Sequence, residues 1–161
     1  DIEHIFNLNI KEKINKIYVP FFSKTNHLRW NKMEDFIAKH GDMCVVENYI
    51  NPPPDPIPSG WRPLKYRDYL EKLSKFKYCL VLCGDGQDVH RNYECLLTST
   101  IPVMEYSSVR DYYQNLNIPI ELYENFSGNV EFNSTHKDKV LYNYWFDMVK
   151  KDAHNIKKEI L

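Results

Sequence analysis

The sequence predicts an α/β protein of Rossmann-like type, with a parallel sheet and helices on both faces. Apolar segments that suit strands alternate along the 161 residues with segments of helical periodicity. The strand segments are nearly continuously apolar, as expected when both faces of a parallel sheet are covered. A loop with two glycines, Gly84 and Gly86, joins one of these strands to a helix. A strand that leads into a loop and a helix N-terminus is how α/β proteins build anion sites.

The first part of the chain supplies a strand and a helix. Lys16–Phe22 is an apolar strand, and Pro20 marks its end or an edge position. A helix is expected from about Leu28 to Lys39, with Asn26 as its cap and Gly41 as its stop. Its apolar face consists of Trp30, Met33, Phe36 and Ile37.

The middle of the chain continues the alternation. Met43–Glu47 is a short second strand. Asn51–Pro63 includes six prolines and is expected to be an extended loop, because proline excludes regular hydrogen-bond ladders. A short helix at Tyr66–Ser74, with Tyr69 facing inward, leads into the strand Phe76–Cys83.

The last part begins with a helix at about Val89–Ser99 and a strand at Ile101–Glu105. A short helix at Val109–Tyr113 and a last strand at Ile118–Leu122 follow. From roughly His136 onward, apolar residues recur at helical spacing, which predicts a C-terminal helix that packs on the core.

One domain is expected, residues 15–161, after a lead-in segment or linker at residues 1–14. The chain starts at Asp1 without methionine, so we expect it to be part of a longer protein. We recognise no targeting segment and no apolar run long enough to span a bilayer. The four cysteines lack close metal-type spacing and suit free buried thiols, which favours the cytoplasm over the Golgi lumen. A net charge of −1 supplies no broad basic field, so nucleic acid is not an expected partner.

The glycine loop and the helix after it carry the candidate chemistry. The two glycines allow positive φ and a close approach of the backbone to a ligand, and the helix amides would point at a phosphate. Arg91 adds a fork suited to a diphosphate, and His90 can donate to the same oxygens or to a sugar hydroxyl. Glu94, one turn after His90, can accept both hydroxyls of a ribose. Asp85 and Asp88 are expected to cap the loop or contact a sugar.

Each of these residues also has a purely structural interpretation. Glycines are common in strand-to-helix turns, a lone histidine is more often structural, and Arg91 with Glu94 can form a surface pair. Their combination at the end of one parallel strand favours a site for a phosphorylated, hydroxyl-bearing ligand such as a nucleotide sugar.

A series of short motifs surrounds the loop: Ser74–Phe76, Gly84–Gly86, His90–Arg91, Tyr93–Glu94, Thr98–Thr100 and Ile101–Val103. From Tyr69 to Met104 this series resembles the exostosin family of glycosyltransferases, and the likeness continues more weakly to Tyr144–Trp145. One departure is Thr100, which stands where the family usually has glycine before the isoleucine-proline pair.

The resemblance implies the C-terminal, donor-binding half of a GT-B glycosyltransferase, which pairs two Rossmann-like domains. Such an enzyme transfers a sugar from a nucleotide-diphosphate sugar to a glycan or protein acceptor, here with inversion, without a metal and without any other cofactor. By this resemblance Glu94 binds the ribose, Arg91 and the loop amides bind the diphosphate, His90 lies near the phosphate or sugar, and Arg29 is a second cationic contact. The chain contains no Asp-x-Asp, the motif expected of a metal-dependent transferase.

The catalytic base is not identified by the sequence, and His90 is the one candidate for a catalytic role. In enzymes of this type the acceptor and its base usually belong to an N-terminal acceptor-binding domain. We therefore expect this chain to bind donor but to transfer sugar poorly by itself.

Two alternatives stay open. A dinucleotide (NAD)-binding oxidoreductase domain would use Gly84-x-Gly86 with Glu105 about 20 residues later, but Val89 occupies the place of the third glycine. A non-catalytic module for a glycan or a protein partner would use exposed tyrosines as stacking faces.

Overall fold

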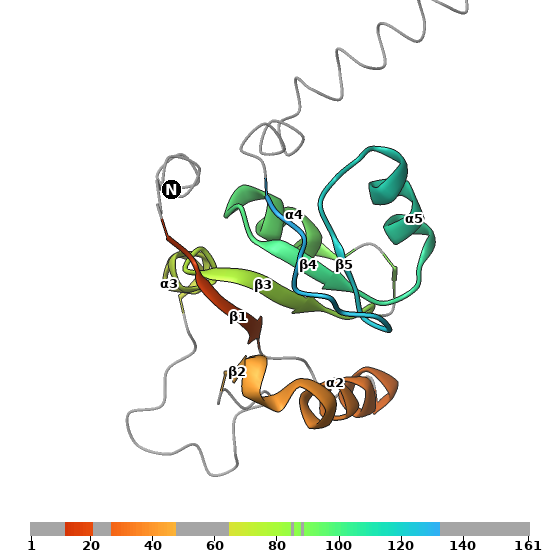
Figure 1. Cartoon of the computed structure of the whole chain (residues 1–161), viewed down its shortest axis with the longest axis horizontal. Coiled ribbons are helices and arrows are strands. Elements are labelled where there is room, and N and C mark those ends of the chain that lie inside the picture. Colours follow the sequence, from red (N-terminus) through yellow and green to blue (C-terminus); the bar gives the residue numbers. More distant parts are fainter. Residues whose placement is uncertain (1–11, 21–26, 48–64, 85, 88, 133–161) are drawn as a thin grey trace, which may run out of the picture.

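The computed structural model describes residues 12–20, 27–47, 65–84, 86–87 and 89–132. They form a five-stranded sheet in which neighbouring strands are all parallel. The strands are β1 (Ile14–Val19), β2 (Cys44–Val46), β3 (Phe76–Val81), β4 (Ile101–Met104) and β5 (Glu121–Leu122), in the spatial order β2-β1-β3-β4-β5. The predicted Rossmann-like α/β class is confirmed (Figure 1).

The helices of the described residues are α2 (His27–His40), the 3-10 turn η1 (Gly41–Met43), α3 (Tyr66–Leu73), α4 (His90–Leu97) and α5 (Ser108–Asn115). Each α-helix matches its predicted range to within two residues at either end. The Asn26 cap, the proline-rich loop at 51–63 and the helix from His136 lie outside the described residues. Within these described ranges, no helix combines the length and the apolar character needed to cross a membrane.

The order in which strands join the sheet reverses at β1. The chain places β2 on one side of β1 and then returns to add β3, β4 and β5 on the other side. Because crossovers between parallel strands are right-handed, this reversal puts α2 on one face of the sheet and the later helices on the opposite face. The carboxyl ends of β1 and β3 therefore form the switch point, where open α/β sheets usually bind ligands.

Two apolar layers hold this arrangement together. Figure 1 shows α2 on one side of the sheet and α4 and α5 on the other. Tyr78 and Leu80 of β3 belong to the layer under α2, with Met33 and Phe36. The intervening β3 residues belong to the other layer, which the helices fill with Leu70, Leu73, Cys95, Leu96 and Tyr113. β3 is thus buried on both faces, which explains its continuous apolar sequence.

β5 is shorter than predicted. The sequence indicates a strand over Ile118–Leu122, but only Glu121 and Leu122 pair with β4. Pro119 falls within the predicted range and has no amide proton to donate to a ladder. The carboxylate of Glu121 is buried and accepts the amides of Ser127, Asn129 and Val130, so it fixes the turn that follows β5.

Thr100 lies at the amino edge of the sheet, just before β4, and is fully buried. Its hydroxyl is 3.1 Å from the carbonyl oxygens of Leu73 and Phe76 and accepts from Lys13 Nζ at 3.2 Å. A threonine at this position is therefore a structural hydrogen-bonding residue. The site expected at the glycine loop lies at the opposite edge, so the departure from the family pattern at Thr100 does not alter it.

Candidate functional site

The glycine loop leaves β3 at the switch point. Leu82 is still buried, whereas Cys83 and Gly84 are half-buried and Gly86 is exposed. The Gly84 amide donates to the carbonyl oxygen of Gly86 over 3.1 Å, which makes the loop tight. Gly84 does not use the positive φ that glycine allows, whereas Gly128 does, at 71°.

Arg29, in the first turn of α2, reaches this loop. A Cβ atom built on Gly84 would lie 3.5 Å from Nη1 of Arg29 and 3.9 Å from its Cζ. The two residues meet because α2 follows β1, the loop follows β3, and these strands are neighbours. A guanidinium beside a bare backbone suits a ligand with several acidic oxygens. The structure therefore brings together two of the predicted site residues that are 55 positions apart in the sequence.

Arg91 and Glu94, both on α4, form a second group with a residue of α3. The hydroxyl of Tyr69 donates to Glu94 Oε2 over 2.9 Å, and Arg91 Nε lies 3.4 Å from the same hydroxyl oxygen. Burial raises the pKa of Tyr69, so its hydroxyl stays protonated and remains a donor to the carboxylate. Burial alone would lower the pKa of Arg91. Tyr69, Cys79 and Glu94 favour the charged guanidinium, and the pKa of Arg91 is raised. Tyr69 thus links two of the predicted site residues of α4, Arg91 and Glu94.

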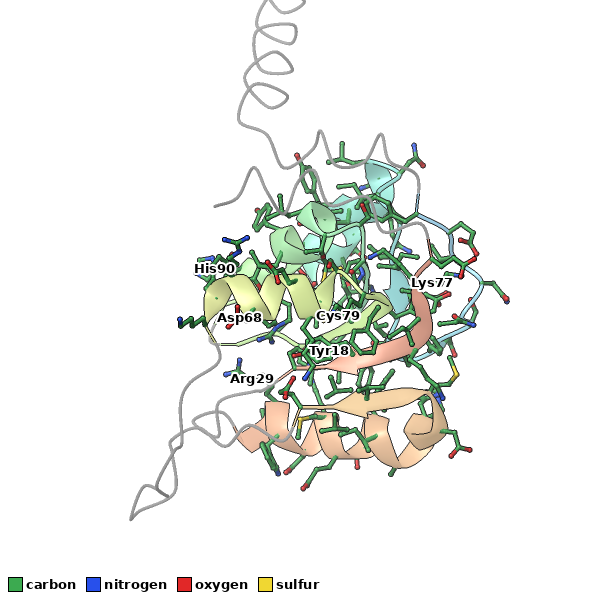
Figure 2. The ribbon with its side chains drawn as sticks, turned by 90° about the vertical axis from the view of Figure 1, so that its left-hand side faces the viewer. Tyr18, Arg29, Asp68, Lys77, Cys79 and His90 are labelled. Atoms are coloured by element: carbon green, nitrogen blue, oxygen red, sulfur yellow. The ribbon has the colours of Figure 1, made fainter. Side chains whose placement is uncertain are left out.

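The N-terminus of α4 opens at the same edge of the sheet. Its cap residue, Val89, makes no side-chain hydrogen bond to the first turn, and that turn holds no acidic residue. The helix dipole and the first amides therefore face the loop with no carboxylate in the first turn of α4 to neutralise them. His90 begins the helix and is exposed. Figure 2 shows His90 and Arg29 toward the same end of the sheet and Lys77, near the start of β3, toward the other.

Glu105, directly after β4, connects β3, β4 and α2. It is buried, accepts the Cys83 amide over 2.6 Å through Oε1, and accepts Lys32 Nζ through Oε2. Both carboxylate oxygens are thus engaged within the protein. This arrangement does not suit the ribose-binding acidic residue of a dinucleotide fold, whose oxygens must reach the ligand. Burial and the charge of Glu105 raise the pKa of the Cys83 thiol, which stays protonated near neutral pH.

The remaining predicted site residues, Asp85 and Asp88, lie outside the described residues. Among the described residues, no three His, Cys, Asp or Glu side chains gather in a way that could hold a metal ion. The four cysteines are free thiols, as predicted: Cys79 and Cys95 are buried, and Cys44 and Cys83 are half-buried.

The fold and this edge of the sheet define an α/β protein of Rossmann-like type with a glycine-containing loop at the switch point, reached by the Arg29 guanidinium. Neither a scan against protein-family models nor a search of the curated proteins found a match to this chain. The resemblance to exostosin-like glycosyltransferases therefore rests on the motifs of the chain itself.

Sequence reasoning missed the roles of Tyr69 and Lys32. Tyr69 is correctly predicted to face inward, but its hydroxyl also holds Glu94. The signal for this role would be pairing between α3 and α4, which no local spacing reveals. In the sequence, Lys32 cannot be distinguished from an ordinary solvent-exposed lysine. In the fold, its Nζ forms an ion pair with the buried carboxylate of Glu105.

Proposed function

We propose that this chain binds a nucleotide-diphosphate sugar and serves as the donor domain of a GT-B glycosyltransferase that transfers the sugar to a glycan or protein acceptor. The contact between Arg29 and Gly84 at the switch point is the observation that carries this proposal. It sets a guanidinium beside the half-buried backbone of Gly84 and near the N-terminus of α4, and these groups together suit a diphosphate.

The proposed roles follow from position. Arg29 and the amides of the loop and of α4 hold the diphosphate, and Arg91 adds positive charge behind them. Glu94, oriented by Tyr69, accepts from the ribose hydroxyls. When the bond between the sugar and the diphosphate breaks, the leaving group gains negative charge, and the arginines and the helix dipole stabilise it without a metal. The enzyme is expected to invert the configuration of the sugar.

Nucleotide binding is the direct test. UDP and GDP are titrated against the protein and compared with NAD by the shift in melting temperature, which rises with ligand occupancy of the folded state. We expect a nucleoside diphosphate to stabilise the protein and Arg29→Ala to weaken that binding by about tenfold or more, the loss of a charge-assisted hydrogen bond. Arg67→Ala is the matched control, since Arg67 forms an exposed pair with Glu71 within α3. Selective stabilisation by NAD, or no response to any nucleotide, would overturn the proposal.

Catalysis is proposed to need a second domain that carries the acceptor and the base. The test is a transfer assay with this chain alone, run with a donor that the melting experiment has shown to bind. We expect binding without efficient turnover. Efficient transfer by the chain alone would contradict this part of the proposal and leave donor binding intact.

A further inference from the structure

Four aromatic rings form a row from the core to the carboxyl edge of the sheet. Phe76 and Tyr18 are stacked, with centroids 5.1 Å apart and planes 13° apart. Tyr18 lies 6.4 Å from Tyr69, and Tyr69 lies 6.3 Å from Tyr66, with interplanar angles of 37° and 32°. These separations fall within the range in which aromatic rings attract one another. The row therefore runs through the first turn of α3 as one packed unit.

The last ring of this row is open to solvent. Phe76 and Tyr18 are buried, whereas 56% of Tyr66 is exposed. Tyr66 is the first residue of α3, and a helix that runs back to the start of β3 must begin at the carboxyl edge of the sheet. The exposed ring thus lies at the edge that holds the glycine loop and the start of α4.

Glu94 belongs to α4, the helix that follows the glycine loop, and its carboxylate contacts Tyr69, the neighbour of this ring. Its Oε2 accepts the hydroxyl of Tyr69, and Tyr69 contacts the ring of Tyr66. The Glu94 carboxylate also acts on the hydroxyl of Tyr66: burial, the charge of Glu94 and a hydrogen bond to Glu94 raise the pKa of that hydroxyl. A carboxylate offers about four lone-pair sites, so Glu94 can accept from a ligand hydroxyl as well as from the hydroxyls of Tyr69 and Tyr66. A ribose held by Glu94 would therefore have an aromatic surface beside it.

We propose that Tyr66 is the platform on which the nucleobase of the donor stacks, as the next member of the aromatic row. This inference rests on the proposed function, because Glu94 must hold the ribose for the base to reach Tyr66. A nucleoside diphosphate then contacts the protein in three places: diphosphate at Arg29 and the loop, ribose at Glu94, and base at Tyr66. Tyr69 is a positioning residue, since it orients Glu94 and supports the ring of Tyr66. Every nucleobase can stack on a tyrosine ring, so this platform does not select a base by its hydrogen-bonding groups. It favours purines over pyrimidines, because a larger base stacks over more of the ring.

The experiment separates the base from the diphosphate. Affinities for UDP, ADP and inorganic pyrophosphate are measured by calorimetry for the wild type and for Tyr66→Ala, Tyr66→Phe and Tyr66→Trp. We expect Tyr66→Ala to weaken UDP about tenfold and ADP more, the loss of a base–aromatic stack, and to leave pyrophosphate unchanged. Tyr66→Phe should stay near wild type, and Tyr66→Trp should bind as well or better. Tyr112→Ala is the matched control, because Tyr112 is an exposed tyrosine of α5.

The outcomes distinguish the two proposals. If the wild type binds neither pyrophosphate nor any nucleotide, the proposed function fails. If the wild type binds UDP and Tyr66→Ala binds it equally well, the platform is wrong while the proposed function stands. Equal losses in Tyr66→Ala and Tyr66→Phe would also overturn the platform, because they would assign the effect to the hydroxyl beside Glu94. Melting temperatures of the variants show whether each remains folded.

Discussion

Nη1 of Arg29 lies 3.5 Å from the point where a β-carbon on Gly84 would be placed. At that distance an added methyl group fits at ordinary van der Waals contact, and the φ of Gly84 poses no obstacle to it. The absence of a side chain at position 84 is therefore not required by the folded backbone. Under the proposed function, the bare backbone lets one ligand contact both the guanidinium and the loop.

The variant Gly84→Ala tests this interpretation. We expect its free energy of unfolding to stay within about 1 kcal/mol of wild type, because a methyl group meets no clash and removes some backbone freedom from the unfolded chain. Its affinity for a nucleoside diphosphate should fall several-fold, because the methyl group separates Arg29 from the ligand. Gly41→Ala is the control, since a Cβ there has nothing within 4 Å. Equal affinities of wild type and Gly84→Ala would argue against a ligand at this contact.

Glu47, which follows β2, gives stability that depends on pH. It accepts the hydroxyl of Tyr18 over 2.7 Å and pairs with Lys72. Burial disfavours the ionised carboxylate of Glu47, but the hydrogen bonds from Lys72 and Tyr18 outweigh this effect. The pKa of Glu47 is therefore lowered from its ordinary 4.5. A carboxyl whose folded pKa is depressed stabilises the fold above its unfolded pKa and loses that contribution as the pH falls through the folded pKa.

Glu47→Gln should therefore be less stable than wild type near pH 7, and the difference should shrink below pH 4.5 as Glu47 becomes protonated in the folded protein. Urea unfolding of both proteins from pH 7 to pH 3 measures this. Glu71→Gln provides the comparison, since the exposed pair of Glu71 with Arg67 should contribute little at any pH. A difference between wild type and Glu47→Gln that does not change with pH would contradict the assignment.

Ser99 holds a backbone conformation that suits glycine. It follows α4 and has a φ of 55°, and the next amide, of Thr100, donates to the Cys95 carbonyl over 2.8 Å. A left-handed residue at the end of a helix is usually glycine. Ser99→Gly removes the strain of a Cβ in this conformation, but it also adds backbone entropy to the unfolded chain. We expect the free energy of unfolding to rise by about 0.5–1 kcal/mol on balance.

Asn117 is the matched site for this change. Its φ is 51°, but asparagine tolerates the left-handed region better than serine. Asn117→Gly should therefore gain less than Ser99→Gly in chemical unfolding. A loss of stability in Ser99→Gly would show that the serine side chain contributes more than its backbone strain costs.

How far the sequence predicts this protein depends on whether a feature is local. The strand Phe76–Cys83 and the helix Leu28–Lys39 are predictable because periodicity and burial act over neighbouring residues. The structure has both elements, the strand over Phe76–Val81 and the helix over His27–His40. Arg29 and Gly84 lie together because β1 and β3 are neighbouring strands, which no local pattern reveals. From the sequence, Arg29 is assigned to the site only by the resemblance to a family. The tie between Tyr69 and Glu94 depends on the packing of α3 beside α4, so it could not be predicted at all.

Asn92 provides a last prediction because its side-chain amide is buried without hydrogen bonds. It is fully buried in the first turn of α4, and within the described part of the chain neither Nδ2 nor Oδ1 has a partner. A buried amide that has lost its water costs free energy unless a hydrogen bond replaces it, whereas an apolar side chain of similar size has no such cost. Asn92→Leu should therefore be as stable as wild type or more stable, by up to about 2 kcal/mol.

Leu96→Ala, one turn further on the buried face of α4, is the reference for loss of packing and should cost about 2–5 kcal/mol. Both changes are measured by urea unfolding, with Asn92→Asp as a third variant that should destabilise because it buries a charge. An Asn92→Leu variant as unstable as Leu96→Ala would contradict the assignment of an uncompensated amide at position 92. If Asn92→Leu is stable, the buried face of α4 tolerates an apolar residue at position 92.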